Sequence, residues 1–286
     1  MTGGGSRRYR AAAGTPRRRP RVRRASARLT PTRSGAILAM LVAAGAIYGL
    51  AATPAFGFEK LEISGAALTP EESIREAVAI ESGTNLVSLT TGPIVARLRD
   101  LPSVGDASVT VGLPDAIRVG VVERAPVMLW AVGGHRFAVD GTGFLFADVG
   151  ETPPPAIAGL PVVTDERVTS AALAVRSSLD PVDLDAATRI GSITPEQIGS
   201  HAATLRVIVT DERGFTITTG PKGWLAVFGK YGRSQRTPAL VPGQVQLLAA
   251  LLQGREDTIQ TIILADDRDG TYIPKPTPKP SASPAP

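Results

Sequence analysis

The sequence predicts an α+β protein in which a basic, disordered N-terminal tail and one transmembrane helix precede two folded domains. Residues 1–33 contain eleven arginines and no acidic residue. Residues 34–58 contain no charged residue. Beyond them, the alternating apolar residues typical of strands are interspersed with short stretches at helical spacing. This order favours a small βααββ domain followed by a mixed α/β domain built on an antiparallel-rich sheet.

The N-terminal tail divides the charge of the chain. The formal net charge is +5, yet the residues after 33 carry 20 basic and 26 acidic side chains. A basic tail of this kind can bind nucleic acid or anionic lipid. Tyr9 is its only aromatic residue and it shows no helical periodicity. We therefore expect residues 1–34 to be disordered, cytoplasmic and attracted to anionic lipid, with no nucleic acid as a partner.

Residues 35–55 are expected to form the transmembrane helix. The 19 residues from Gly35 to Thr53 would span about 28 Å as a helix, close to the hydrocarbon core of about 30 Å. The arginines on the N-terminal side predict a cytoplasmic N-terminus, with Lys60 onward outside the cell membrane, as in a single-pass type II protein. The small residues at 51–53 could instead be a signal-peptide cleavage site, but the apolar run exceeds the roughly 7 to 15 residues of such signals.

Composition narrows the chemistry that the chain can perform. It has no cysteine, which excludes disulfide bonds and thiolate metal sites. Its two histidines, His135 and His201, lie beside glycine or serine in loop-like sequence. We interpret each as a solvated loop residue rather than a metal ligand or a member of a catalytic triad.

Residues 58–124 predict the βααββ domain. Before its first helix, Thr69 supplies a cap, Pro70 suits the first helical position, and Glu71 and Glu72 place acids in the first turn. The predicted elements are a strand over 58–64, helices over 69–79 and 91–100, and strands over 104–111 and 117–121 around a turn at 112–115. Such a unit can bury one sheet face under its two helices.

The segments between these elements carry a resemblance to a known family. They are Gly65 after the first strand, Gly83-Thr84-Asn85-Leu86 between the helices, Leu101-Pro102-Ser103-Val104 before the hairpin, and Val121 to Pro126 at its end. In this order they resemble the POTRA domain of the FtsQ/DivIB family, which are bitopic bacterial cell-division proteins. The resemblance implies a POTRA domain over 56–125 and an FtsQ-type β domain over 126–273.

Glu123, Arg124 and Pro126 are expected to mark the junction of the two domains. Pro126 cannot donate to a sheet ladder, so it ends the strand of the first domain. The next segments predict strands over 129–132 and 135–140, followed by a glycine-rich turn at 140–143. That turn has one carboxylate, too few for a calcium-binding loop.

The second domain is predicted from shorter patterns. The expected elements are an extended proline-rich connector over 150–161, a helix over 170–179, one further turn over 194–199, a hairpin over 204–220, a strand over 224–228, a helix over 242–253 ended by Gly254, a strand over 258–264 and an edge at 271–273. Residues 274–286 are proline-rich and of low complexity, so we expect a disordered tail.

No constellation in the sequence indicates catalysis or a cofactor. Asp266, Asp267 and Asp269 surround an arginine, which is typical of a solvated turn rather than a metal site. Residues 220–223 lack the strand, loop and helix context of a phosphate-binding loop. The acidic pair at 211–212 lies on a predicted hairpin tip, where paired catalytic carboxylates are poorly placed. We therefore expect a protein that is not an enzyme and binds neither a cofactor nor a metal.

The resemblance implies a function in recruitment. It implies a scaffold of the division septum that binds FtsB- and FtsL-like bitopic proteins by adding a partner strand to an open sheet edge, and so controls septal peptidoglycan synthesis. The expected partner contact is the last strand, with Ile262, Ile263, Leu264, Thr271, Tyr272 and Ile273. A second recruitment surface is expected on the POTRA domain at Thr69, Pro70, Glu71 and Glu72, and at 86–89.

Two questions stay open at this point: where the partner strand binds, and to which functional class the protein belongs. The last strand continues as Ile262-Ile263-Leu264-Ala265-Asp266-Asp267, where an Asp-Leu-Arg ending is expected of proteobacterial members, so the position of the partner strand is not settled. The other functional class is a POTRA-containing outer-membrane assembly or secretion component that handles unfolded client strands. That class is expected to carry several POTRA repeats, and this sequence shows one.

Overall fold

The computed structural model describes residues 31–52, 54–234 and 236–276, which form two compact units that divide after Ala52. The first unit is the helix α1 (Pro31–Ala52). No helix in the described part of the chain has the length and apolar character needed to cross a membrane. The transmembrane helix expected over 35–55 is therefore not confirmed and stays a prediction. The tails expected to be disordered lie outside the described residues, except 31–34 and 274–276.

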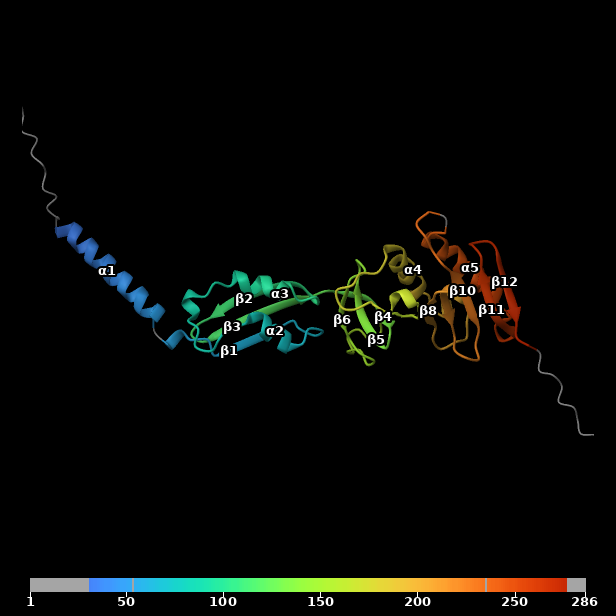
Figure 1. Ribbon diagram of the computed structural model, residues 1–286, viewed down its shortest axis with the longest axis horizontal. Coiled ribbons are helices and arrows are strands. Elements are labelled where there is room, and N and C mark those ends of the chain that lie inside the picture. The colour runs from blue at the N-terminus through green and yellow to red at the C-terminus, as the bar shows by residue number, and fades with distance from the viewer. Residues whose placement is uncertain (1–30, 53, 235, 277–286) are drawn as a thin grey trace, which may run out of the picture. The chain divides into compact units, whose positions relative to one another are not determined.

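The second unit begins with a three-stranded sheet of order β1-β3-β2 (Figure 1). In this sheet β1 (Lys60–Ser64) lies parallel to β3 (Ala116–Glu123), which pairs antiparallel with β2 (Val104–Gly112). The helices α2 (Glu71–Val78) and α3 (Gly92–Arg99) contact each other, and α3 contacts β2. The predicted βααββ order is thus confirmed, with each helix within two residues of its expected ends.

One sheet face and the two helices bury a single apolar core. Its fully buried members include Ile74 of α2, Leu98 of α3 and Ile117 of β3. Arg97 of α3 donates to the carbonyl oxygens of Ala77 and Val78 at distances of 2.7 Å, which satisfies acceptors that the end of α2 leaves unpaired. The helix pair is therefore held by both packing and a polar contact.

A nine-stranded sheet forms the rest of this unit, in the order β12-β11-β10-β9-β8-β7-β4-β5-β6. Most neighbours are antiparallel, but β4 pairs parallel with β7, β7 with β8, and β10 with β11. The strands are β4 (Pro126–Val132), β5 (His135–Asp140), β6 (Leu145–Asp148), β7 (Val162–Asp165), β8 (Arg206–Thr210), β9 (Gly214–Thr218), β10 (Leu225–Gly229), β11 (Ile259–Leu264) and β12 (Gly270–Pro274). Pro274, expected to begin the tail, is the last residue of β12.

Two helices, α4 (Pro181–Gly191) and α5 (Val241–Leu252), pack on this sheet (Figure 1). Trp130, Phe228 and Ile262 from the strands join Ile190 and Leu248 from the helices in one buried cluster. The opposite face of β4, β5 and β6 is covered by the connector through Ile157. Single 3₁₀ turns lie at Pro54–Phe56, Leu86–Ser88, Val168–Ser170, Glu196–Ile198, Pro238–Leu240 and Glu256–Thr258.

One expectation for this domain is wrong, and one strand was not predicted. Residues 170–179 form no helix; the helix α4 begins after them, because Asp180 accepts a hydrogen bond from the Val182 amide and Pro181 occupies the first helical position. Residues 162–165, to which no element was assigned, form β7 in the middle of the sheet. The remaining predicted strands and helices are present.

Two polar side chains, the buried Gln244 and the half-buried Arg236, hold the ends of the parallel strands β10 and β11. Gln244 of α5 is fully buried and donates to the carbonyl oxygens of Phe228 and Leu264, both at 3.2 Å. Arg236 also donates to Leu264, at 2.6 Å. These donors satisfy carbonyl groups at the point where the two strands stop pairing, which a buried sheet end requires. They therefore anchor β11, the strand that carries β12.

Glu256, just before β11, collects hydrogen bonds from two other segments. Its carboxylate accepts from the Trp224 indole nitrogen and the His201 amide, each at 2.9 Å, and from the Ser200 hydroxyl. Burial alone would raise the pKa of Glu256, but these hydrogen bonds lower it to about 2. The charged carboxylate thus ties the start of β11 to β10 and to the loop after Ile198.

Glu256→Gln should lower the free energy of unfolding by about 2–3 kcal/mol at pH 7, following the depressed pKa of the carboxylate. Because the folded pKa lies below the unfolded one, this contribution is fully present above about pH 4.5 and is lost as the pH falls toward 2. Urea unfolding of both proteins from pH 7 to pH 3 measures the difference. Glu151→Gln, at an exposed side chain, is the control, and a difference that does not shrink on acidification would contradict this account.

Candidate functional site

The end of the nine-stranded sheet at β12 is an open edge. In the described structure β12 pairs with β11 and with no other strand. All of its residues are exposed, including Tyr272 at 41% and Ile273 at 48%. An unpaired edge presents a row of backbone donors and acceptors to which a further strand can bind.

The register between β11 and β12 shows that the predicted contact residues lie on both faces of the sheet. Tyr272 lies opposite Ile262, and both therefore point to the side covered by α5. Ile262 and Leu264 are buried there, so neither is accessible to a partner. Ile273 lies on the other face, opposite Thr261, while Ile263 is opposite Thr271. Of the six predicted residues, four are thus exposed or half-buried side chains and two belong to the core.

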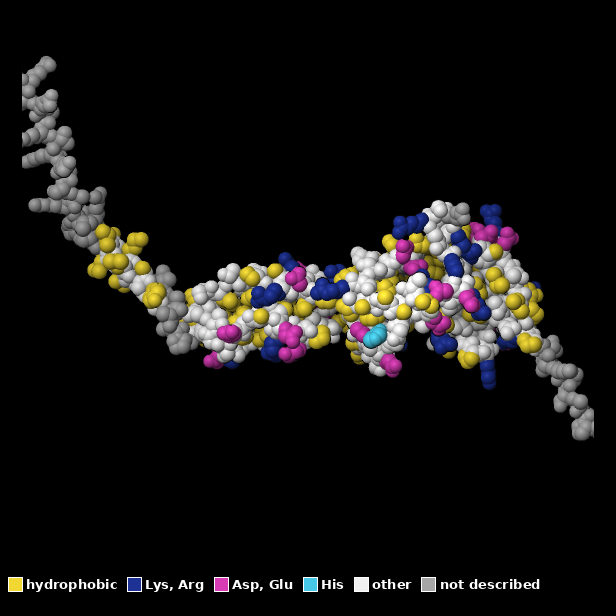
Figure 2. All heavy atoms as spheres, in the orientation of Figure 1, with side chains coloured by type: hydrophobic (Ala, Val, Ile, Leu, Met, Phe, Trp, Pro, Cys, Tyr) yellow, Lys and Arg dark blue, Asp and Glu magenta, His cyan; other side chains and the backbone are white. Residues whose placement is uncertain are grey.

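The face away from α5 has an open groove of about 600 Å³ beside β12. Ile263, Ile273 and Val227 supply its apolar surface. Glu212, Arg213 and Lys230 supply charged side chains along it. Hydrophobic side chains gather at this end of the molecule in Figure 2. A strand added to β12 would therefore meet an apolar surface as well as unpaired backbone groups.

At the other end of the sheet, the chain itself pairs with the start of β6. The segment 176–179, which we term the strap, runs alongside residues 143–145. The Leu145 amide donates to the Ser177 carbonyl at 2.9 Å, and the Arg176 amide donates to the Leu145 carbonyl at 2.8 Å. Phe144 and Ser178 form a further bridge. Part of the segment expected to be a helix therefore occupies the backbone groups of Leu145 at the start of β6, whereas all residues of β12 are exposed.

The junction residues Glu123 and Arg124 together contact both domains, and Arg124 alone donates to the Pro102 carbonyl oxygen as well as to Asp140. The Glu123 carboxylate accepts from the amides of Leu68 and Thr69, at 2.9 Å and 2.6 Å, and from the Thr69 hydroxyl at 2.7 Å. Arg124 donates to Asp140 of β5 at 2.9 Å and lies 4.8 Å above the ring of Phe144. Adjacent residues thus bind the loop before α2 and the first hairpin of the larger sheet.

Asp140 is the centre of the glycine-rich turn. Burial would raise its pKa, but hydrogen bonds from Thr142, from the Phe144 amide and from Arg124 lower the pKa below its usual value. One of its oxygens already accepts from Thr142 and Phe144, and the other accepts from Arg124. The turn is therefore internally satisfied, as a hairpin turn is expected to be.

The predicted recruitment surface on the POTRA side is only partly exposed. Thr69 is 6% exposed and engaged with Glu123 and Ser103, so its role is structural. Pro70, Glu71 and Glu72 are exposed at the start of α2. In the second candidate segment, Leu86 is buried and Val87 is 47% exposed. The expectation that all these residues are exposed is wrong for Thr69 and Leu86.

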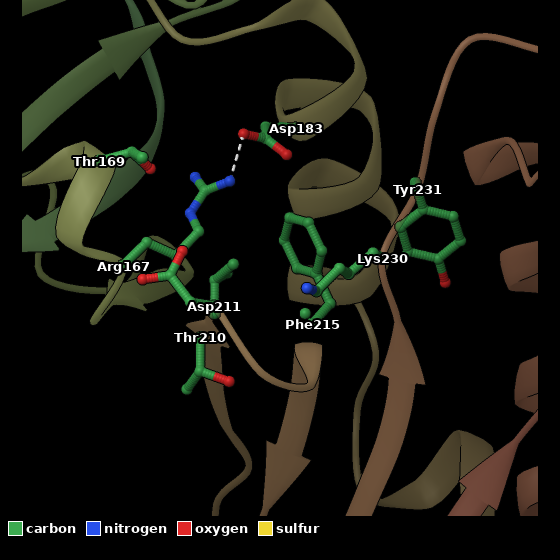
Figure 3. Close-up of a pocket in the computed structure, with 10 residues that line it drawn as sticks. Arg167, Thr169, Asp183, Thr210, Asp211, Phe215, Lys230 and Tyr231 are labelled. Atoms are coloured by element: carbon green, nitrogen blue, oxygen red, sulfur yellow. Dashed lines mark hydrogen bonds and ion pairs between the residues drawn. The ribbon is translucent and has the colours of Figure 1, made fainter.

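A pocket of about 240 Å³ lies at the ends of β8 and β9, next to α4 (Figure 3). Arg167 forms two side-chain hydrogen bonds with Asp165 and one with Asp183 at 2.7 Å. Hydrogen bonding to Asp165 raises the pKa of Arg167 above its ordinary value. The guanidinium group is thus used to tie β7 to α4. Across the described residues, no group of three or more acidic or histidine side chains is arranged to hold a metal.

Comparison with known proteins confirms the family resemblance of the sequence. The family model described as "POTRA domain, FtsQ-type" matches residues 56–124. The chain is 30% identical over 188 residues to the cell division protein FtsQ of Streptomyces collinus, covering 65% of this chain and 70% of that protein. It belongs to the FtsQ family of cell-division proteins.

Two further FtsQ relatives define the extent of the match. The FtsQ of Chloroflexus aurantiacus is 28% identical over 248 residues, or 84% of this chain and 79% of that protein. The FtsQ of Mycobacteroides abscessus is 31% identical over 172 residues, or 59% of this chain and 54% of that protein. The match thus spans about half the length of the mycobacterial FtsQ proteins.

In this FtsQ-family chain, Arg124→Met should lower the free energy of unfolding by about 1–3 kcal/mol, because Asp140, 9% exposed, would lose its cation. Urea unfolding of the full chain measures this change. Arg118→Met is the matched control, since Arg118 pairs with Glu62 at 2.8 Å where both side chains are exposed. That control should change stability by less than about 1 kcal/mol. Equal effects of the two substitutions would show that the Arg124 contacts do not stabilise the junction.

Proposed function

We propose that this chain is a non-enzymatic scaffold of the bacterial division machinery. It binds FtsB- and FtsL-like bitopic proteins through β12 and so regulates septal peptidoglycan synthesis at the division septum. The open, exposed edge of β12 carries the proposal, because an unpaired strand beside an apolar groove is suited to strand addition. Membership of the FtsQ family supports the role in division.

The pairing of the strap with the start of β6 favours β12 over β6 as the binding edge. A sheet with two open edges could bind strands at both ends, and could also associate with other copies of itself. The strap occupies the backbone N–H and C=O of Leu145 at the start of β6, which shortens the edge available there and favours β12 as the site for a partner strand. Tyr272 suits an anchor, because it offers a rigid aromatic surface and a polar tip at the exposed edge.

The proposal includes a bitopic, type II arrangement in the cell membrane. The uncharged residues 34–58 and the eleven arginines before them support it. The arginine-rich tail binds anionic lipid on the cytoplasmic side. In this arrangement the two sheets lie outside the cytoplasm, where extracytoplasmic segments of other bitopic proteins can reach β12.

The edge is tested by calorimetric titration of the full chain, in mild detergent, with an FtsB/FtsL-like coiled-coil pair from the same cell. We expect micromolar or tighter binding that is lost on truncation after Leu264 and weakened about tenfold by Tyr272→Ala. Val168→Ala, which shortens a side chain that is 81% exposed elsewhere, should bind as the unmodified chain does. Absence of binding by the folded chain would favour the other class, a POTRA protein with unfolded client strands.

The membrane arrangement is tested by cysteine labelling, which is clean because the chain has no cysteine. We expect Ser88→Cys to react with a membrane-impermeant maleimide on spheroplasts, and Ser6→Cys to react only after permeabilisation. Retention of the Ser6→Cys label in the full-length band separates a permanent anchor from a cleaved signal peptide. Labelling of both sites before permeabilisation, or loss of the N-terminal segment, would contradict the proposal.

A further inference from the structure

Along β12, residues whose backbone groups bond to β11 alternate with residues whose backbone groups face outward. The Asp269 carbonyl accepts from the Ala265 amide at 2.9 Å, and the Lys275 amide donates to the Thr258 carbonyl at 2.7 Å. In an extended strand, residues two apart direct their backbone groups to the same side. Residues 271 and 273 are therefore turned to β11, whereas Gly270, Tyr272 and Pro274 face the open side.

Pro274 sets the length of that open side. Proline has no N–H group and is tolerated in strands where that group would face solvent. The outward groups of β12 are therefore the N–H and C=O of Gly270, the N–H and C=O of Tyr272, and the C=O of Pro274 alone. An added strand finds its last donor at Tyr272, which limits both its length and its register.

Because Gly270 has no side chain, two leucines of α5 can approach the sheet edge. It lies opposite the buried Leu264, so its missing side chain would point toward α5. A Cβ atom there would lie 3.0 Å from Leu247 Cδ2 and 3.4 Å from Leu251 Cδ1. Both leucines are half-buried. They form a leucine shelf (Leu247 and Leu251) that reaches the sheet edge because no side chain separates them from it.

A residue placed opposite Gly270 on an added strand would lie on the same face as the leucine shelf. A large apolar side chain at that position would cover Leu247 and Leu251 and remove their exposed surface from water. Its neighbours in the added strand would point to the other face, toward the groove with Ile273 and Ile263. Both faces of the added strand are thus bounded by apolar side chains.

We infer that the β12 edge selects a short extended segment of a partner protein that places a large apolar side chain opposite Gly270, in a register limited by Pro274. The inference rests on the proposed function, since it specifies which strand the β12 edge accepts. The leucine shelf determines the residue type, and the outward N–H groups of Gly270 and Tyr272 determine the register.

The test uses the full chain in mild detergent and the FtsB/FtsL-like pair, with binding measured by calorimetry. Leu247→Ala removes half of the leucine shelf and should weaken binding at least fivefold. Gly270→Ala places a methyl group against Leu247 and should weaken it at least tenfold. The double variant Gly270→Ala with Leu247→Ala regains space and should bind more tightly than Gly270→Ala alone. That recovery is not expected if the single variants only destabilise the fold.

Leu184→Ala on α4 is the matched control for the leucine shelf. Leu184 is also a half-buried leucine beside a glycine, with its Cδ2 atom 3.4 Å from a Cβ atom built at Gly143, near β6. It should leave binding unchanged. A second substitution is expected to increase the affinity. Pro274→Val adds an outward N–H group and should tighten binding about threefold to tenfold. Its control, Pro155→Val in the connector, should leave the affinity unchanged.

The outcomes distinguish a failure of the proposed function from a failure of the inference about Gly270 and Pro274. If the unmodified chain is folded and does not bind the pair, the proposed function fails. If it binds, but Leu247→Ala and Pro274→Val leave the affinity unchanged, the proposed function stands and the selection at Gly270 and Pro274 is wrong. Thermal unfolding of each variant, followed by circular dichroism, confirms that the compared proteins are folded at the titration temperature.

Discussion

Backbone hydrogen bonding at the two ends of the larger sheet is the constraint on which the rest of the structure depends. A sheet that does not close on itself leaves a row of N–H and C=O groups at each end, and these groups must be covered or left to solvent. Here the two ends are treated differently. The strap pairs with the start of β6, whereas β12 is short, exposed and ended by a proline. This asymmetry separates a structural end of the sheet from an accessible one.

Polar contacts within the sheet fix β11, the strand next to the open edge. Gln244 and Arg236 bind the carbonyl groups where β10 and β11 end, and Glu256 fixes the chain just before β11. The strand next to the open edge is thus held by buried polar contacts as well as by the core. A rigid β11 keeps β12 in one register, and that register places Tyr272 and Ile273 on opposite faces.

The fold could be predicted from the sequence where local patterns decide the structure. The βααββ order follows from alternation, from the acids at the start of α2 and from the turn at 112–115, and all of these are short-range signals. The strap and β7 could not be predicted in this way. Apolar spacing over 170–179 is compatible with a helix, and only the pairing of 176–179 with residues 143–145 favours a non-helical path. Four residues of β7 carry no pattern of their own, because both neighbours come from distant parts of the chain.

The candidate site shows the same limit. The position of Tyr272 and Ile273 at the end of the domain is enough to predict that they lie on a sheet edge. The sequence alone does not show which face of β11 packs against α5. Ile262 and Leu264 are therefore predicted as contact residues, although both side chains belong to the core. Likewise, Glu123 and Arg124 were recognisable as a charged pair before a proline, while Thr69 and Asp140, their partners, were not.

The short connection at this junction has a mechanical consequence. Only Arg124 and Ala125 separate β3 from β4; Glu123 is bound to the loop before α2, and Arg124 is bound both to the Pro102 carbonyl and to Asp140 of β5. A covalent link of two residues contains almost no slack, so tension applied along the chain on one side passes directly into the hydrogen-bond ladder of the other. Load is therefore carried by strands in series, and the weakest ladder along that line decides how much force the protein can bear.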